Sequence, residues 1–315
     1  MYNIVIIGAG QLGSRHLQGV KKSNLPLSIW VVDPNESSLK IAKERYECID
    51  GENKSVFFVK HIDKLPVRID LAIISTSSKP RLIVIKQLLK HSIVSNMVLE
   101  KFLFPKLSDY DEARVLIEKN KINTWVNCPR RMMPIYKSLK SHMVSGPITM
   151  KYVNNNWGLC CNSIHFIDIF LYITGENLFN IDLSDIEKKI IPSKREGYIE
   201  LCGTIKITTP HKNQLILSSL ENYQGKHNVQ IINDQKSYEI DEINGIIKDA
   251  NNSTHFQMPF QSDLSGIMVE QILSDKKSDL TSFHESASYH YHFLEQIVKY
   301  YNIMTGSNDD SCPIT

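Results

Sequence analysis

The sequence predicts an α/β protein of two domains, in which a doubly wound parallel sheet is followed by an α+β domain with a large, mostly antiparallel open sheet. Three observations predict this fold class. The chain has 315 residues, the length of about two domains. Its first part alternates continuous apolar runs with helical patterns, as in parallel sheets buried on both faces. After about residue 127 the pattern changes, and from about 186 to 248 short strand-like runs follow one another without helices between them, which is typical of antiparallel sheets.

The first domain is predicted over residues 1–126. Short runs rich in Ile, Val and Leu indicate strands at 3–7, 27–32, 56–59, 70–75, 94–99 and 123–126. Helical patterns lie between them at 14–22, 36–46, 81–91 and 110–119. This alternation favours parallel strands joined by crossover helices.

The second domain is predicted over residues 127–315. Its helices are expected at 133–144, 163–174, 263–274 and 282–301. Its strands are expected at 148–154, 186–191, 203–209, 214–220, 228–233 and 237–240. The tail from 306 to 315 is expected to be loosely held, as chain ends often are.

Composition excludes several classes of function. Lys and Arg number 36 against 34 Asp and Glu, and a net charge of +2 argues against a nucleic-acid binder. None of the six cysteines forms a C-x-x-C pair, so we expect reduced thiols and no metal site. No apolar run approaches the roughly 20 residues that span a bilayer, and the N-terminus lacks a signal-peptide pattern. We therefore expect a cytoplasmic protein that binds neither nucleic acid nor membrane.

A glycine motif, Gly8-x-Gly10-x-x-Gly13, directly follows the first predicted strand. In dinucleotide-binding folds the first glycine allows a tight turn, the second lets the pyrophosphate approach the backbone, and the third lets helix and strand pack closely. Asp33 ends the second strand 20 residues after Gly13, where such folds place the acid that binds the ribose. The cofactor residues predicted here are Gly8, Gly10, Gln11, Leu12, Gly13 and Asp33. The alternative is a glycine turn in an unrelated α/β protein.

The same motif bears on the choice of cofactor. A carboxylate at Asp33 repels a 2′-phosphate, and no arginine follows it, so NAD is favoured over NADP. NADP remains the less favoured alternative, because Ser37 and Ser38 could bind a phosphate.

Two further polar segments follow predicted strands, at the sheet edge where ligands bind in such folds. Ser75, Thr76 and Ser77 could contact the ribose and nicotinamide, or form an ordinary turn in which a serine caps the next helix. Glu100-Lys101 ends another strand. The Lys101 ammonium could hydrogen-bond a substrate hydroxyl there, or simply be solvated.

His165 and Asp168 are three residues apart on an otherwise apolar predicted helix, so they share one face. A polar pair on a buried helix needs partners or a cleft. A carboxylate beside an imidazole also fixes its tautomer, as a general base requires. The alternative is a hydrogen-bonded histidine of the core.

Four motifs in one order, GAGQLGSRH, STSSKPR, VLEKF and NSIHFID, resemble the glucose–fructose oxidoreductase / inositol dehydrogenase / MocA family. The resemblance implies a Rossmann domain, an α+β domain, and NAD(P)-dependent hydride transfer to or from a sugar, cyclitol or sugar nucleotide. It makes Lys101 and His165 catalytic and places Glu100 near the nicotinamide. Asp168 matches the aspartate three residues after the catalytic histidine, and we expect it to orient the imidazole.

The chain departs from the family pattern at three positions. Phe102 replaces a proline that often follows a cis bond, and phenylalanine should adopt cis less easily. Arg81 stands where many members have a histidine, and Cys161 where they have an aspartate. Two alternatives therefore stay open. One is a non-catalytic NAD-binding regulatory protein, and the other is a reductase of a non-carbohydrate carbonyl or imine on the same fold.

A carbohydrate-like substrate is expected, and its candidate contacts are Arg131, Tyr152, Asn156, Trp157, Asn162 and His165. Trp157 could stack on a sugar face and Arg131 could meet a carboxylate or phosphate. Each could instead be ordinary packing. Because this family seldom leaves the broad sheet bare, a homo-oligomer, dimer or tetramer, is also expected.

Overall fold

The computed structural model describes residues 1–50, 54–143 and 146–315. The chain divides into two compact units. The first contains Met1–Phe104, Ser108–Pro129 and Pro259–Ala287, and the second contains Pro105–Leu107, Arg130–Met258 and Ser288–Thr315. The sequence-based boundary at 126/127 lies close to the crossing at Pro129. The return of 259–287 to the first unit is not visible in the sequence pattern.

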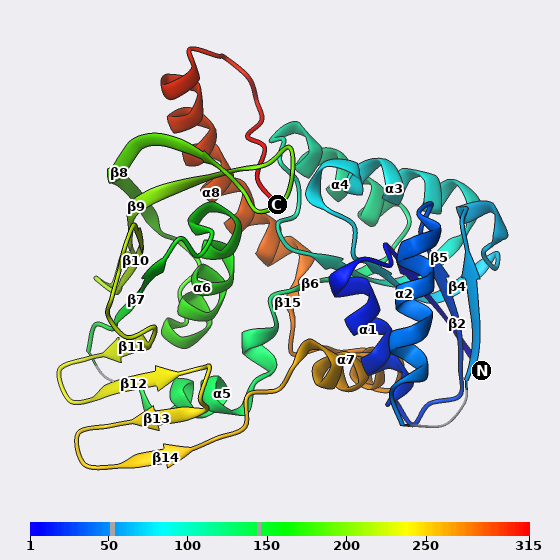
Figure 1. Cartoon of the computed structure of the whole chain (residues 1–315), viewed down its shortest axis with the longest axis horizontal. Coiled ribbons are helices and arrows are strands. Elements are labelled where there is room, and N and C mark those ends of the chain that lie inside the picture. The colour runs from blue at the N-terminus through cyan, green and yellow to red at the C-terminus, as the bar shows by residue number, and fades with distance from the viewer. Residues whose placement is uncertain (51–53, 144–145) are drawn as a thin grey trace. The chain divides into compact units, whose positions relative to one another are not determined.

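The first unit is built on a seven-stranded sheet with the order β15-β6-β5-β4-β1-β2-β3 (Figure 1). Six strands run parallel: β1 Tyr2–Ile7, β2 Leu27–Val32, β3 Ser55–Val59, β4 Arg68–Ile74, β5 Ile93–Glu100 and β6 Asn123–Asn127. The two-residue β15, Thr281–Ser282, pairs antiparallel with β6. The predicted doubly wound parallel sheet is confirmed.

Helices of the first unit follow the strands as expected. They are α1 Gln11–Lys21, α2 Glu36–Glu47, α3 Ser78–His91, α4 Ser108–Lys119 and the short 3-10 helix η1 Ile62–Lys64. Helix α2 begins where it was predicted, and α1, α3 and α4 begin two or three residues earlier. Helix α3 begins three residues before the predicted start, because Pro80 is tolerated in a first turn where its missing N–H is no loss.

Helix α7, Gln261–Asp275, packs on α1 in the first unit. The two helices approach closely at two glycines. A Cβ on Gly19 would lie 2.6 Å from Ser265 Cβ, and one on Gly266 would lie 2.8 Å from the Gly19 carbonyl oxygen. This close contact explains why a segment late in the sequence belongs to the first unit.

The second unit contains an eight-stranded sheet with the order β14-β13-β12-β11-β7-β10-β9-β8 (Figure 1). Its strands are β7 Thr149–Asn155, β8 Asn180–Pro192, β9 Ile199–Thr208, β10 Gln214–Leu220, β11 Val229–Ile232, β12 Ser237–Asp241, β13 Ile246–Lys248 and β14 Ser253–His255. Only the β7–β10 pair is parallel, so the predicted mostly antiparallel sheet is confirmed. Strands β13 and β14 were not predicted, because they are three residues each and carry no apolar alternation.

Three helices accompany this sheet: α5 Pro134–His142, α6 Leu159–Thr174 and α8 Phe283–Thr305, which begins in the first unit. The helix predicted to reach Val144 ends at His142, and Val144 lies outside the described residues. Helix α6 begins four residues early because Glu200, on β9, caps it. The Cys160 amide donates to Glu200 Oε2 at 2.7 Å, a long-range cap that local sequence cannot show.

The tail was expected to be loosely held, and that prediction is wrong. Cys312 and Ile314 are fully buried. The Cys312 amide donates to the Pro105 carbonyl at 2.9 Å, and the Ile199 amide donates to the Pro313 carbonyl at 2.8 Å. The tail thus ties the 105–107 segment to the edge of β9, and burial of its apolar side chains explains the anchoring.

None of the helices in the described ranges is long and apolar enough to cross a membrane. Within the same residues, no three His, Cys, Asp or Glu side chains gather as metal ligands would.

Candidate cofactor site and catalytic residues

The three glycines of the loop between β1 and α1 differ in what surrounds them. Gly8 has φ +98°, a conformation that favours glycine. A Cβ on Gly13 would lie 1.7 Å from the Gly8 carbonyl oxygen, whereas one on Gly10 would meet no atom within 4 Å. The fold therefore requires glycine at 8 and 13, while Gly10 borders open space.

That open space lies at the N-terminus of α1. Gly10 is the N-cap, and no side chain caps the helix there. The first N–H groups of the helix and its dipole are thus available to an anion, as at pyrophosphate sites. The space at Gly10 and the N-terminus of α1 therefore fit the pyrophosphate of the dinucleotide that the glycine motif predicts.

Asp33 lies beside this loop, as predicted. Its Oδ2 accepts from the Ala9 amide at 2.8 Å, and its Oδ1 accepts from the Asn35 amide at 2.9 Å. Ser75 lies against the same loop. Its hydroxyl lies 2.7 Å from the Gly8 carbonyl oxygen and bonds within the protein, so it supports the loop.

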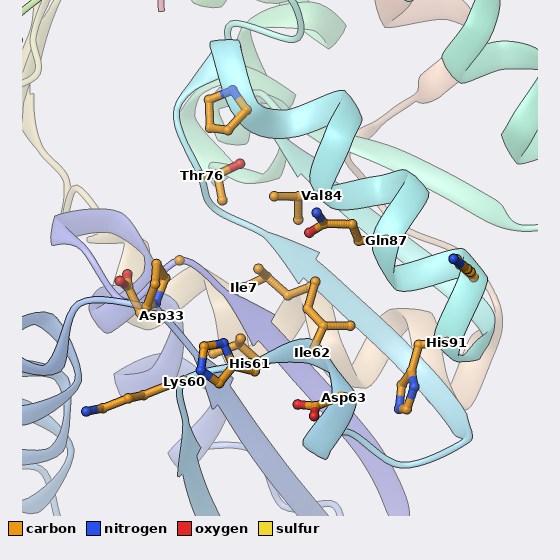
Figure 2. Close-up of a pocket in the computed structure, with 15 residues that line it drawn as sticks. Ile7, Asp33, Lys60, His61, Ile62, Asp63, Thr76, Val84, Gln87 and His91 are labelled. Atoms are coloured by element: carbon orange, nitrogen blue, oxygen red, sulfur yellow. The ribbon is translucent and has the colours of Figure 1, made fainter.

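A cavity of about 800 Å³ opens in the first unit next to Asp33 (Figure 2). It is lined by Ile7, Gly8, Val32, Asp33, Pro34, Lys60, His61, Ile62, Asp63, Thr76, Pro80, Val84, Gln87, Lys90 and His91. Of these residues, only Gly8, Asp33 and Thr76 were predicted from the sequence. The spacing of Pro80, Val84, Gln87 and His91 on one face of α3 was the available signal. Thr76 Oγ1 is buried at this wall and has no hydrogen-bond partner among the described residues.

Ser77 takes the N-cap position of α3, but its side chain makes no capping hydrogen bond. Gln11 and Leu12 are exposed in the first turn of α1, at the open space beside Gly10. Their backbone N–H groups, rather than their side chains, are what the site can use.

Glu100 is enclosed within the first unit, with 3% of its surface exposed. Its Oε1 lies 2.7 Å from His16 Nε2 and accepts from Asn127 Nδ2 at 2.6 Å. Burial alone would raise the pKa of Glu100, but its contacts with His16 and Asn127 and the charge of Arg81 hold that pKa below its ordinary value. The carboxylate is therefore part of a buried network, and its place near the nicotinamide stays a prediction.

Arg81 organises the segment that carries Lys101. The guanidinium is completely buried and donates to the carbonyl oxygens of Thr76, Phe102 and Leu103. It therefore joins the loop after β4 to the loop after β5. The Lys101–Phe102 peptide bond is cis, contrary to our expectation for a phenylalanine, and the Phe102 side chain is fully buried.

In the second unit, Asp168 and Arg131 bind each other. Arg131 Nε donates to Asp168 Oδ2 at 2.8 Å, and both residues are buried. Arg131 is a partner 37 residues away from Asp168, which local spacing cannot reveal. That Asp168 orients His165, and that Arg131 meets a substrate anion, stay predictions. His165 itself is half-buried on α6.

Two substrate candidates form an aromatic cluster with Phe166, which the sequence analysis did not single out. Tyr152 stacks on Phe166 with centroids 4.5 Å apart, and Trp157 meets Tyr152 edge-to-face at 5.0 Å. Asn162 Nδ2 donates to the Trp157 carbonyl at 2.8 Å, which fixes the loop before α6. Asn156 packs differently, because its Oδ1 accepts from Cys202 Sγ at 3.6 Å.

Arg130, also missed, lies over the Phe166 ring at 4.5 Å. Its Nε and Nη2 donate to the two carboxylate oxygens of Glu242, and Tyr136 donates its hydroxyl to Oε1 of that carboxylate. Burial would raise the pKa of Glu242, but the Arg130 charge and these hydrogen bonds hold it below its ordinary value. The arginine next to the aromatic cluster is therefore already neutralised.

Cys161 is buried at the start of α6, where the family aspartate was expected. Its amide donates to Glu200 Oε1 at 3.3 Å, and its Sγ accepts from the Thr315 amide at 3.4 Å. The thiol is thus part of the packing between α6 and the tail.

Comparison with known proteins finds a family match for the first part of the chain. Residues 2–128 match the profile of the oxidoreductase family with an NAD-binding Rossmann fold, Gfo/Idh/MocA. These residues belong to that family. The resemblance is confirmed over these residues, which contain three of the four motifs. No curated protein is similar enough in sequence to count as a relative.

Solved structures resemble the chain over almost its whole length. An oxidoreductase from Agrobacterium radiobacter, in complex with NAD+, L-tartaric acid and magnesium, is 14% identical with a TM-score of 0.70, covering 98% of both chains. UDP-N-acetylglucosamine 3-dehydrogenase from Acidithiobacillus ferrooxidans is 13% identical with a TM-score of 0.68, covering 93% of this chain and 96% of its own. The super-repressor mutant of Gal80p from Saccharomyces cerevisiae is 12% identical with a TM-score of 0.71, covering 98% of both chains. At these identities the likeness extends the family fold to the second unit and says no more.

Proposed function

We propose that the protein is an NAD(P)-dependent oxidoreductase that transfers a hydride between a nicotinamide cofactor and a hydroxyl or carbonyl of a sugar, cyclitol or sugar nucleotide. The observation that carries this proposal is the glycine loop, with its open space at Gly10, next to Asp33 and a large cavity. The likeness to UDP-N-acetylglucosamine 3-dehydrogenase supports a sugar or sugar nucleotide as the substrate.

NAD is the proposed cofactor rather than NADP. The Asp33 carboxylate is held at the edge of the cavity by the Ala9 amide, where it would accept from ribose hydroxyls and repel a 2′-phosphate. Lys60 also lines the cavity, but Glu36 Oε2 lies 2.8 Å from its ammonium and opposes its charge.

Lys101 and His165 are the proposed catalytic residues. When bound, the nicotinamide supplies the hydride acceptor or donor. Lys101 donates a hydrogen bond to the reacting oxygen, and His165 takes the hydroxyl proton during oxidation. Asp168 is proposed to orient the His165 imidazole on the same helix, while its ion pair with Arg131 holds the segment after β6 against that helix.

Cofactor reduction with a panel of neutral sugars, cyclitols, sugar nucleotides and acidic sugars tests this proposal. His165→Asn and Lys101→Met should each lower turnover by roughly 10²–10⁴ while NAD affinity stays near normal. His211→Asn and Lys119→Met, at exposed positions, are matched controls and should leave turnover unchanged. Turnover that survives both active-site variants would overturn the assignment of these residues.

A non-catalytic, NAD-binding regulatory protein is the second candidate. The observation in its favour is Cys161, a buried thiol engaged with the tail at the position of the family aspartate. Tight NAD binding with no turnover on the panel would favour this candidate. Turnover only with simple imines or non-carbohydrate carbonyls would favour the reductase alternative.

A further inference from the structure

We infer that the first unit recognises the adenine base of its cofactor through Gln87, whose side-chain amide binds the amino-bearing edge of the base. The inference rests on the proposed function and adds a residue that selects the base. It starts from the cavity next to Asp33, in which Gln87 is one of the lining residues.

A dinucleotide bound at the glycine loop would have its adenine base beside Gln87. The pyrophosphate fits the open space at Gly10, and the adjacent ribose fits Asp33. Beyond Asp33 the cavity is bounded by residues 60–63 on one side and by α3 on the other. A base attached to that ribose therefore enters between these two walls.

The walls suit a flat, largely apolar ring. Ile7 and Ile62 contribute apolar surface on one side, and Pro80 and Val84 on the other. Gln87 follows Val84 on the same face of α3, because Pro80, Val84 and Gln87 are spaced at i, i+4 and i+7. Ligand pockets of this kind use a few polar groups among apolar ones to fix the orientation of the ligand.

Gln87 is placed to be such a group. Figure 2 shows its side chain extending from α3 toward the cavity, next to Val84 and, in this view, above Ile62. Across the ranges that the structure describes, its amide forms no hydrogen bond with the protein. Its neighbour Lys86 points elsewhere and pairs with Glu112 at 2.5 Å.

An amide matches adenine because it carries an acceptor and a donor side by side. The exocyclic amine of adenine donates to Oε1, and an adjacent ring nitrogen accepts from Nε2, as in the glutamine–adenine pairs of nucleic-acid recognition. Replacing the amine by hydrogen removes the donor on the base from which Oε1 would accept, whichever way the amide is turned. The base is therefore selected by its amino group.

The test compares NAD with nicotinamide purine dinucleotide, in which hydrogen replaces the adenine amino group. Calorimetric titration of the full chain should show NAD binding about fivefold or more tightly, as expected for one hydrogen bond. Gln87→Leu should lose that preference by weakening NAD alone. Lys86→Ala, one residue away and outside the cavity lining, should keep it.

The outcomes separate this inference from the proposed function. Equal binding of the two dinucleotides by the unmodified chain, or a preference that persists in Gln87→Leu, overturns the role of Gln87 alone. Binding of neither dinucleotide overturns the proposed function and this inference together.

Discussion

Single residues explain most of what the sequence could reveal about the cofactor site. The glycine spacing and Asp33 identify a nucleotide loop because each position answers a local requirement of backbone geometry or charge. The structure separates these requirements. A side chain at position 13 would collide with the Gly8 carbonyl oxygen, whereas a side chain at position 10 would meet no atom of the protein. Residues such as Gln87 and Ile62 could not be assigned, because their role depends on two segments meeting across a cavity.

Gly13→Ala should destabilise the fold, and Gly10→Ala should not. The added methyl at position 13 would collide with the Gly8 carbonyl oxygen, 1.7 Å away, and overpacking of this kind costs about 1–3 kcal/mol or more. The methyl at position 10 would meet no atom within 4 Å. Urea unfolding of the two variants measures the difference, and equal midpoints would contradict this account of the loop.

Cys161→Asp should lower stability rather than improve catalysis. The start of α6 already holds the buried Glu200 carboxylate, and a second carboxylate there would be repelled and poorly solvated. Cys161→Ser is the control of similar size without charge. A thermal midpoint equal to that of the control, together with higher turnover, would show that the missing aspartate alone limits activity.

At the scale of helices and strands, the sequence predicted where most elements lie but not what holds their ends. The apolar runs of the parallel sheet and the helices between them are local signals, and they were read correctly to within a few residues. The early start of α6 depends on Glu200 from β9, and the tail depends on Pro105 and Ile199. Such contacts join residues far apart in the chain, so the local spacing of apolar residues cannot predict them.

The buried network at the end of β5 should make stability depend on pH through Glu100. Because the pKa of Glu100 in the folded state lies below its ordinary value of 4.5, its contribution to stability is present above that value. It is lost as pH falls through the folded-state pKa. Urea unfolding between pH 3 and pH 7 should therefore show stability falling below about pH 4.5.

Glu100→Gln should be less stable at pH 7 and should show a shallower fall in acid, because it cannot be protonated. Glu47→Gln, at an exposed position, serves as the control. A slope in Glu100→Gln equal to that of the unmodified chain would show that other carboxylates govern the acid transition.

At the scale of the whole molecule, we propose that the eight-stranded sheet joins two or more copies of the chain. One face of the sheet is fully buried, as Ile205, Leu215 and Leu217 show, and α6 packs against β9 and β10. Residues of the other face, including Ile216 on β10 and Val153 on the adjacent β7, keep partial exposure. A broad face of mixed apolar and polar side chains is suited to an interface with a second copy.

Sedimentation at micromolar concentration should therefore give a dimer or tetramer. Ile216→Glu, near the middle of the partly exposed face, should shift the chain toward monomer without unfolding it. Lys212→Glu, in the turn before β10, is the control. A monomer in the unmodified chain would overturn the proposed assembly and leave the cofactor site untouched.

The central claim is that the loop between β1 and α1 binds a dinucleotide, and one titration tests it directly. The unmodified chain and Gly10→Ala, which should be equally stable, are each titrated with NAD in a calorimeter at the same pH and salt concentration. We predict one NAD per chain, with affinity at least about tenfold weaker in Gly10→Ala, because its methyl occupies the space where the pyrophosphate approaches the backbone. No binding to the unmodified chain, or equal affinity in both, would contradict the account.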